Sequence, residues 1–124
     1  MGYSFGSVVA STCVAQQLPA EKVCGLIAVS YPCGWMSSWI FGSHYRLVHT
    51  PASPETFDPL PKLFVIGDRD DFSSTHQIGA FVAKVKNALL SFIPNASHFY
   101  DFGDQKNSLG NAIIQWIDSN IPPE

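Results

Sequence analysis

Two glycines flank a serine at the start of this chain, in the order Gly2-Tyr3-Ser4-Phe5-Gly6. A Gly-x-Ser-x-Gly pattern is typical of a serine held on a sharp turn between a strand and a helix, with its hydroxyl exposed. The turn strains the serine backbone, and Gly2 and Gly6, which lack a Cβ atom, let the strand and the helix approach closely. Such a turn needs a strand before it, and only Met1 precedes the motif, so we expect part of the support for this serine to be missing.

Predicted helices and strands alternate along the rest of the chain. Three helices are predicted, over residues 5–18, 73–86 and 105–119. The second begins at a cap, Ser73 or Ser74, and ends at about residue 86. Its apolar stripe runs from Ile78 to Leu89. Residues 22–30, 62–67 and 88–93 are short apolar runs typical of strands. Alternating strands and helices pair the strands in parallel through right-handed crossovers. We therefore predict an α/β fold of three layers, with these three strands, in this order, forming a short parallel sheet between helices on both faces.

Residues 31–61 show no periodic pattern. They contain five prolines together with Trp35, Trp39, Phe41 and Tyr45. Loops of this length in a small domain are usually functional or disordered. The aromatic content favours a packed segment, with a short helix near residues 36–41.

Composition and charge exclude several classes of protein. The 124 residues allow one domain, and the net charge of −3 without a Lys/Arg run lacks the signature of nucleic-acid or anionic-membrane binding. No stretch reaches the roughly 18–20 apolar residues of a membrane span. Cys13, Cys24 and Cys33 form no Cys-x-x-Cys pair, which argues against a disulfide framework or a zinc site. Free cysteines favour a reducing compartment, so we expect a cytoplasmic protein.

Three residues that suit nucleophilic catalysis follow one another along the chain. A serine hydroxyl needs a histidine to take its proton and a carboxylate to orient that histidine. Ser4 precedes the first helix, Asp70 lies just past the strand over 62–67, and His98 lies just past the strand over 88–93. Functional groups of an open parallel sheet gather at the carboxyl ends of its strands. The three side chains are therefore predicted to converge, with Asp70 facing His98. The Asp70–His98 contact should be better formed than the Ser4–His98 contact, because both of its loops follow strands that are present in the chain.

At these positions the chain resembles the carboxyl-terminal half of the α/β-hydrolase superfamily. Gly2-Tyr3-Ser4-Phe5-Gly6-Ser7 looks like its nucleophile elbow, Gly67-Asp68-Arg69-Asp70 like the turn that presents the acid, and Ala96-Ser97-His98-Phe99 like the late histidine loop. The order of the three motifs is the order of that family, and the resemblance covers almost the whole chain.

The resemblance implies a role for each of these residues. Ser4 would be the nucleophile, His98 the general base and acid, and Asp70 the orienting carboxylate. The backbone N–H of Phe5, the residue after the nucleophile, would be one donor of the oxyanion hole. Residues 31–61 lie where these enzymes insert a cap or lid. The substrate would be a small ester-like molecule, and neither a metal nor an organic cofactor is implied.

Each assignment has a structural alternative. Ser4 could belong to a disordered amino terminus, and His98 to an exposed surface loop. Asp68 and Asp71 compete with Asp70; Asp68 is early for the family's turn, and Asp71 is placed to cap the next helix. Trp35 and Trp39 line an acyl pocket in one interpretation and form the core of the cap in the other. The remaining histidines have no motif context and are predicted to be structural or exposed: His44, His49 and His76.

Two functions from different classes follow. In the first, the chain is the truncated part of a serine hydrolase that cleaves an ester, thioester or amide bond; alone it would be a weak esterase, slower than a longer chain with the upstream strands. In the second, it is a catalytically inactive fragment that acts as an interaction module. The strand over residues 22–30 would lack its neighbour and form an exposed apolar edge, so self-association through it is expected.

Overall fold

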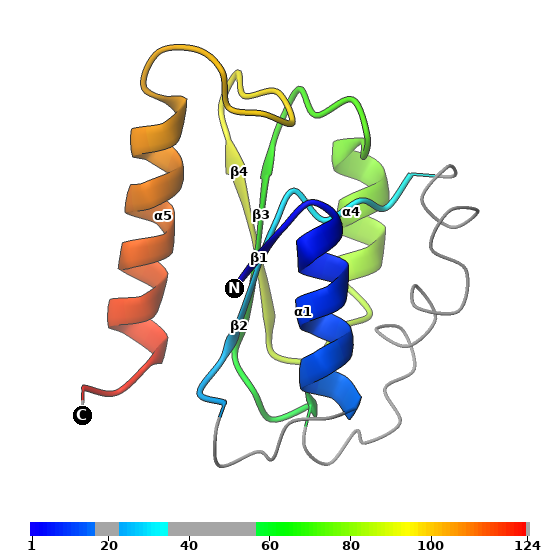
Figure 1. The fold of residues 1–124 in the computed structure, drawn as a ribbon, viewed down its shortest axis with the longest axis vertical. Helices are drawn as coiled ribbons and strands as arrows, with labels where there is room; N and C mark the ends of the chain where they lie inside the picture. Colours follow the sequence, from blue (N-terminus) through cyan, green and yellow to red (C-terminus); the bar gives the residue numbers. More distant parts are fainter. Residues whose placement is uncertain (17–22, 35–56, 124) are drawn as a thin grey trace.

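The computed structural model describes residues 1–16, 23–34 and 57–123 (Figure 1). Strands and helices alternate from the first residues onward, as the sequence predicts. In chain order the elements are β1 (Gly2–Tyr3), α1 (Phe5–Gln16), β2 (Leu26–Val29), β3 (Lys62–Gly67), α4 (Thr75–Val82), β4 (Ala88–Ile93) and α5 (Gln105–Asn120). The short helix expected near residues 36–41, and most of the predicted cap over 31–61, lie outside the described residues.

The strands form one parallel sheet in the order β1-β2-β3-β4. The three predicted strands are confirmed in their predicted order, and β3 and β4 have the predicted bounds. The sheet has a fourth strand, which the sequence pattern does not predict. It consists of the first two residues of the serine motif, and it pairs Gly2 with Ala28 and Tyr3 with Val29. The serine turn therefore has a strand before it, although a short one.

This pairing corrects the expectation that residues 22–30 form the exposed edge of the sheet. The strand is shorter than predicted, and its two last residues, Ala28 and Val29, are covered by β1. Within the described part of the chain, Leu26 and Ile27 have a strand partner only on the β3 side. Self-association stays a prediction, and it is now restricted to the first half of β2.

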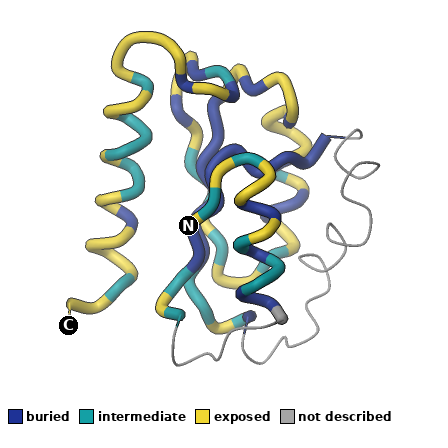
Figure 2. Tube along the Cα trace, viewed as in Figure 1, coloured by how far each residue is buried: buried dark blue, intermediate teal, exposed yellow. Residues whose placement is uncertain are grey.

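The sheet lies between two layers of helices, with α1 and α4 on one face and α5 on the other (Figure 1). Successive side chains of a strand point to opposite faces, so β2 and β3 contribute to two cores. One core packs Leu26, Ala28, Phe64 and Ile66 with residues of α1 and α4. The other packs Ile27, Val29, Leu63 and Val65 with Trp116 of α5. Figure 2 shows the resulting buried central strands and the largely exposed outer helix α5, which confirms the three-layer prediction.

Helix α4 begins as predicted and ends earlier than predicted. Ser74 caps it through a capping box in which Gln77 N–H donates to Ser74 Oγ (3.2 Å) and Ser74 N–H donates to Gln77 Oε1 (3.0 Å). The helix stops at Val82. Leu89, predicted to extend its apolar stripe, lies in β4 and is 55% exposed. The predicted stripe is therefore too long; a short apolar run such as the one around Leu89 fits the helical and the strand period alike.

One charged residue is buried in the sheet. Lys62 opens β3, and its ammonium donates to the carbonyl oxygens of Leu60 (2.7 Å), Lys86 (2.9 Å) and Asp58 (3.4 Å). An ammonium group has three protons, and all three are used, so the buried charge is satisfied. This contact fixes the end of the sheet that lies opposite the serine turn.

No helix in the described residues is long and apolar enough to cross a membrane.

Candidate active site

Ser4 sits on a sharp turn between β1 and α1. Its φ is 51°, in the left-handed region that non-glycine residues rarely adopt. Two hydrogen bonds hold the turn: Ser4 N–H donates to the Val29 carbonyl oxygen, and Ser7 N–H donates to the Ser4 carbonyl oxygen, both at 2.9 Å. The predicted strained backbone of the serine is therefore present, and pairing with β2 maintains it.

The two glycines of the motif have different roles. A Cβ atom at Gly2 would lie 2.2 Å from the carbonyl oxygen of Gly6, which is closer than real Cβ contacts. Among the residues that the structure describes, no atom outside the adjoining backbone would lie within 4 Å of a Cβ atom at Gly6. The close approach that the motif predicts is thus seen at Gly2, whereas no described neighbour requires glycine at position 6.

This difference gives a matched pair of substitutions. Gly2→Ala forces the backbone of the turn to shift, and we expect it to lower the free energy of unfolding by about 1–3 kcal/mol, the usual effect of overpacking. Gly6→Ala lies in the first turn of α1 and should leave stability unchanged or raise it by up to about 1 kcal/mol. Urea unfolding followed by circular dichroism measures both. Equal destabilisation by the two substitutions would contradict the close approach at Gly2.

Asp70 is presented by the turn that follows β3. Asp70 N–H donates to the Gly67 carbonyl oxygen (3.2 Å), and one carboxylate oxygen accepts from the backbone N–H groups of Phe72 (2.8 Å) and Ser73 (3.2 Å). The side chain is fully buried. These bonds fix the carboxylate and leave its second oxygen for another partner. Its two competitors, Asp68 and Asp71, are exposed.

The loop after β4 is packed tightly onto this turn. Asp68 N–H donates to the Ile93 carbonyl oxygen (3.1 Å), and Arg69 N–H donates to the Ala96 carbonyl oxygen (3.0 Å). A Cβ atom at Gly67 would lie 2.1 Å from that Ala96 oxygen, so only glycine fits there. The glycine of the Gly67-Asp68-Arg69-Asp70 turn therefore lets the loop with His98 approach Asp70.

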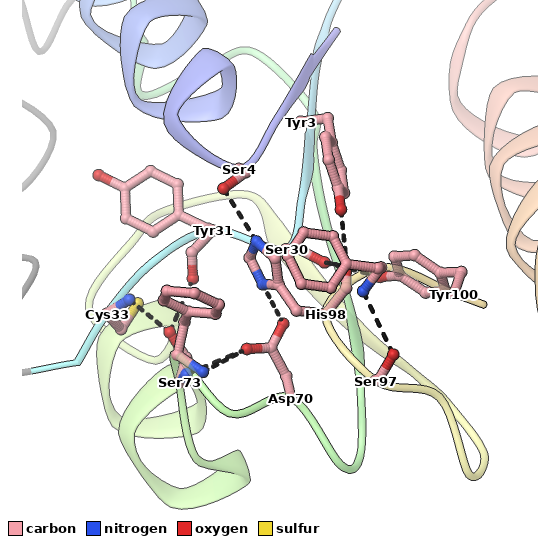
Figure 3. Close-up of polar contacts among 12 residues, drawn as sticks. Tyr3, Ser4, Ser30, Tyr31, Cys33, Asp70, Ser73, Ser97, His98 and Tyr100 are labelled. Carbon is pink, nitrogen blue, oxygen red and sulfur yellow. Dashed lines mark hydrogen bonds and ion pairs between the residues drawn. The ribbon is translucent and has the colours of Figure 1, made fainter.

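His98 lies between Asp70 and Ser4 (Figure 3). Its Nδ1 is 2.8 Å from Asp70 Oδ2, and its Nε2 is 2.9 Å from Ser4 Oγ. The residue is 3% exposed. The rings of Phe72, Phe99 and Tyr3 surround the imidazole, with centroid distances of 4.4, 5.1 and 5.7 Å. The histidine is thus screened from water on the sides that do not face Ser4.

This arrangement can activate a hydroxyl group. An ionised carboxylate only accepts hydrogen bonds, so its bond to His98 places a proton on Nδ1 and leaves Nε2 as the acceptor for the Ser4 hydroxyl. The predicted convergence of the three side chains is observed, from three loops at the same end of the sheet. The Asp70–His98 contact is predicted to be better formed than the Ser4–His98 contact. The two distances differ by only 0.1 Å.

The other candidate residues are placed as follows. Phe5 is the first residue of α1, so its backbone N–H lies at the amino-terminal end of that helix, beside Ser4. His76 is exposed on α4, as predicted. Four candidates lie outside the described residues: Trp35, Trp39, His44 and His49.

Several residues that support the site were not predicted. Ser73 Oγ accepts a hydrogen bond from Cys33 N–H and donates to the Tyr31 carbonyl oxygen (3.1 Å), which ties the Asp70 turn to the segment after β2. Tyr3 and Ser30 donate to the carbonyl oxygen of His98, and the Tyr100 hydroxyl is hydrogen-bonded to Ser30 Oγ. Tyr3 lies inside the serine motif, at a position where the motif allows any residue, and the others belong to no motif. The sequence pattern held no signal for them.

Among residues 1–16, 23–34 and 57–123, no group of three or more His, Cys, Asp or Glu side chains is placed to hold a metal ion.

Solved structures resemble this chain over almost its entire length, although no protein-family model and no curated protein matches it. The esterase domain of a Rhodothermus marinus protein is 12% identical with a TM-score of 0.70, and it covers 98% of this chain and 60% of its own length. An α/β serine hydrolase without lid from Xanthomonas campestris is 21% identical with a TM-score of 0.69, covering 99% of this chain and 47% of its own. Est1E from Butyrivibrio proteoclasticus, solved with ferulic acid, is 20% identical with a TM-score of 0.65. The match covers 97% of this chain and 58% of Est1E.

This chain therefore spans about half to three fifths of the length of these structures. At such identities the likeness concerns the fold. The parallel sheet with helices on its faces is the feature that this chain shares with those structures. This chain has a partial α/β-hydrolase fold.

Proposed function

We propose that this chain is a serine hydrolase that cleaves an ester, thioester or amide bond. Ser4 is the nucleophile, His98 the general base and then the general acid, and Asp70 the carboxylate that orients His98. The observation that carries the proposal is the unbroken hydrogen-bonded line from Ser4 Oγ through His98 to the buried Asp70, with contacts of 2.9 and 2.8 Å. Buried, aligned groups of these three types are what a serine nucleophile requires.

The reaction follows from the positions of the protons. His98 Nε2 takes the hydroxyl proton as Ser4 Oγ attacks the carbonyl carbon, and Asp70 stabilises the imidazolium that forms. The negative charge on the carbonyl oxygen is held by the Phe5 N–H at the start of α1, where the helix dipole also favours an anion. His98 then gives its proton to the leaving alcohol, thiol or amine. Water, deprotonated by His98, hydrolyses the acyl-serine and restores the hydroxyl.

We propose a small ester-like molecule as the substrate. Among the similar structures are an esterase domain, a dienelactone hydrolase and Est1E with ferulic acid, and these names favour esters over amides. The exposed rings of Phe72 and Phe99 beside His98 give the site an apolar rim. Residues 31–61 are proposed as the cap, with Trp35 and Trp39 in the acyl pocket. In the described residues at the two ends of this segment, Tyr31 and Phe57 pack into the core.

Hydrolysis of a short activated ester, p-nitrophenyl acetate, by the purified chain tests this function. We expect a burst of p-nitrophenol that approaches one equivalent per chain and then slower turnover, because the acyl-serine accumulates when its hydrolysis is slower than its formation. The hydrolysis rates of the matching thioester and anilide, compared with that of the ester, show which of the three bond types is cleaved fastest. Release at the rate of the buffer alone would contradict the proposal and favour the inactive interaction module.

A further inference from the structure

Ser4 and His98 lie on loops that follow the two outermost strands of the sheet. Ser4 follows β1 and His98 follows β4, which are the first and last strands in the order β1-β2-β3-β4. Neighbouring strands are about 4.8 Å apart, so the loop after β4 must cross three strand spacings, roughly 14 Å, to bring the imidazole to Ser4. A loop that travels this far needs fixed points along its course.

The fixed points follow the strand order. Over β3, the loop is held by the backbone bonds from Asp68 and Arg69 to the Ile93 and Ala96 carbonyl oxygens. Over β2, it is held by Ser30, the residue that follows that strand, whose Oγ donates to the His98 carbonyl oxygen at 3.4 Å. Over β1, it is held by Tyr3, whose Oη donates to the same oxygen at 2.8 Å. Figure 3 shows Tyr3 and Ser30 gathered beside His98.

The His98 carbonyl oxygen is therefore fully used. A carbonyl oxygen has two lone pairs, and it accepts from Tyr3 and from Ser30. Since Ser30 donates its only proton to that oxygen, the bond of 3.0 Å between Ser30 Oγ and Tyr100 Oη is donated by Tyr100. Burial raises the pKa of Tyr100 to about 12, so its hydroxyl keeps the proton that this bond needs. Of the two direct donors, Tyr3 makes the shorter contact.

We propose that Tyr3 is a positioning residue for His98: its hydroxyl fixes the His98 backbone so that the imidazole bridges Asp70 and Ser4. This inference rests on the proposed function. Tyr3 suits the task because it immediately precedes Ser4 and pairs with Val29 in the sheet, so one residue sets both the nucleophile and the backbone of the base. Its ring also packs beside the imidazole, at a centroid distance of 5.7 Å.

Tyr3→Phe tests the inference because it keeps the ring and removes the hydroxyl. We expect kcat for p-nitrophenyl acetate to fall about 3- to 10-fold with KM unchanged. A loss of this size corresponds to one hydrogen bond, and KM stays constant because that bond aligns the base and does not bind the substrate. Thr12→Val is the matched control, since it removes a hydroxyl bond to a backbone carbonyl (Thr12 Oγ1 to Val8 O, 2.9 Å) within α1. The control should leave both constants unchanged. A raised KM at constant kcat in Tyr3→Phe would overturn the inference.

A double-mutant cycle with His98→Ala separates positioning from a direct role of Tyr3. If Tyr3 acts through His98, then Tyr3→Phe has nothing to misplace once the imidazole is gone, and its effect on the residual rate should fall below about 2-fold. The same loss in both backgrounds would show that Tyr3 acts on the substrate or on the serine turn, and would overturn the inference.

A second readout does not depend on turnover. The proton on His98 Nδ1 lies in the bond to the buried Asp70, and its exchange with water can be followed by NMR. We expect faster exchange in Tyr3→Phe than in the wild type and no change in Thr12→Val; equal exchange in all three would overturn the inference. If the wild type hydrolyses no ester, the proposed function fails, and this measurement still decides the role of Tyr3.

Should Tyr3→Phe not fold, Ser30→Gly replaces it, because glycine tolerates the φ of 50° at that position. This substitution removes the second donor to the His98 carbonyl oxygen, and faster exchange is again the expected result.

Discussion

Ser4→Ala is expected to lower kcat for p-nitrophenyl acetate by roughly 10⁴- to 10⁶-fold. In the proposed mechanism, Ser4 Oγ is the atom that bonds to the acyl group, and neither His98 nor Asp70 can replace it. Alanine keeps the Cβ atom and the strained φ of 51°, so the fold should change little. Initial rates with a p-nitrophenol readout measure the effect, and urea unfolding verifies the fold.

The control for this substitution is Ser119→Ala. Ser119 lies on the exposed side of α5, where its Oγ donates to the Gln115 carbonyl oxygen (2.8 Å). It should retain wild-type activity. Comparable ester hydrolysis by Ser4→Ala and the wild type would mean that another group is the nucleophile, and the assignment of Ser4 would be wrong.

Asp70→Asn is expected to lower kcat by roughly 10³- to 10⁴-fold. An asparagine oxygen can still accept the bonds from Phe72 N–H and Ser73 N–H, so the turn after β3 should be retained. The amide nitrogen then faces His98 Nδ1 as a donor. The imidazole must accept there, its proton moves to Nε2, and Nε2 can no longer accept the proton of Ser4.

The neighbouring acids provide matched controls for Asp70. Asp68→Asn and Asp71→Asn remove the same charge from the same turn, and both side chains are exposed. Each should retain kcat to within about 2-fold, because long-range effects of exposed charges are small and screened by salt. A large loss in Asp71→Asn together with a small one in Asp70→Asn would reverse the assignment.

The residues that carry the proposed chemistry could be predicted because a parallel sheet restricts where they lie. All carboxyl ends of parallel strands meet at one edge, so Ser4, Asp70 and His98 could be brought together from their positions relative to predicted strands. Choosing Asp70 over Asp71 needed the spacing of the turn after Gly67. The structure supplies the physical reason, since Asp70 alone of the three acids there is buried.

The remaining features depend on contacts that leave no local pattern. A strand of two residues, such as β1, has no period to detect, and it exists because Gly2 and Tyr3 pair with β2. Leu89 fits both the helical stripe and the predicted strand over 88–93, and its pairing with Leu63 decides between the two. The bond between the Tyr3 hydroxyl and the His98 carbonyl oxygen joins residues 95 positions apart. Such a contact follows from the assembled sheet, which single-sequence periodicity does not describe.

The most direct test of the proposed chemistry is covalent labelling of the wild-type chain by a fluorophosphonate, which reacts with an activated serine. Intact-mass spectrometry is expected to show one adduct per chain, and peptide mapping should place it on the peptide that contains Ser4. The reaction should be strongly slowed in His98→Ala, since the hydroxyl then has no base. An unlabelled Ser4 in a folded chain, or an adduct on another serine, would contradict the assignment of Ser4, His98 and Asp70 as a catalytic triad.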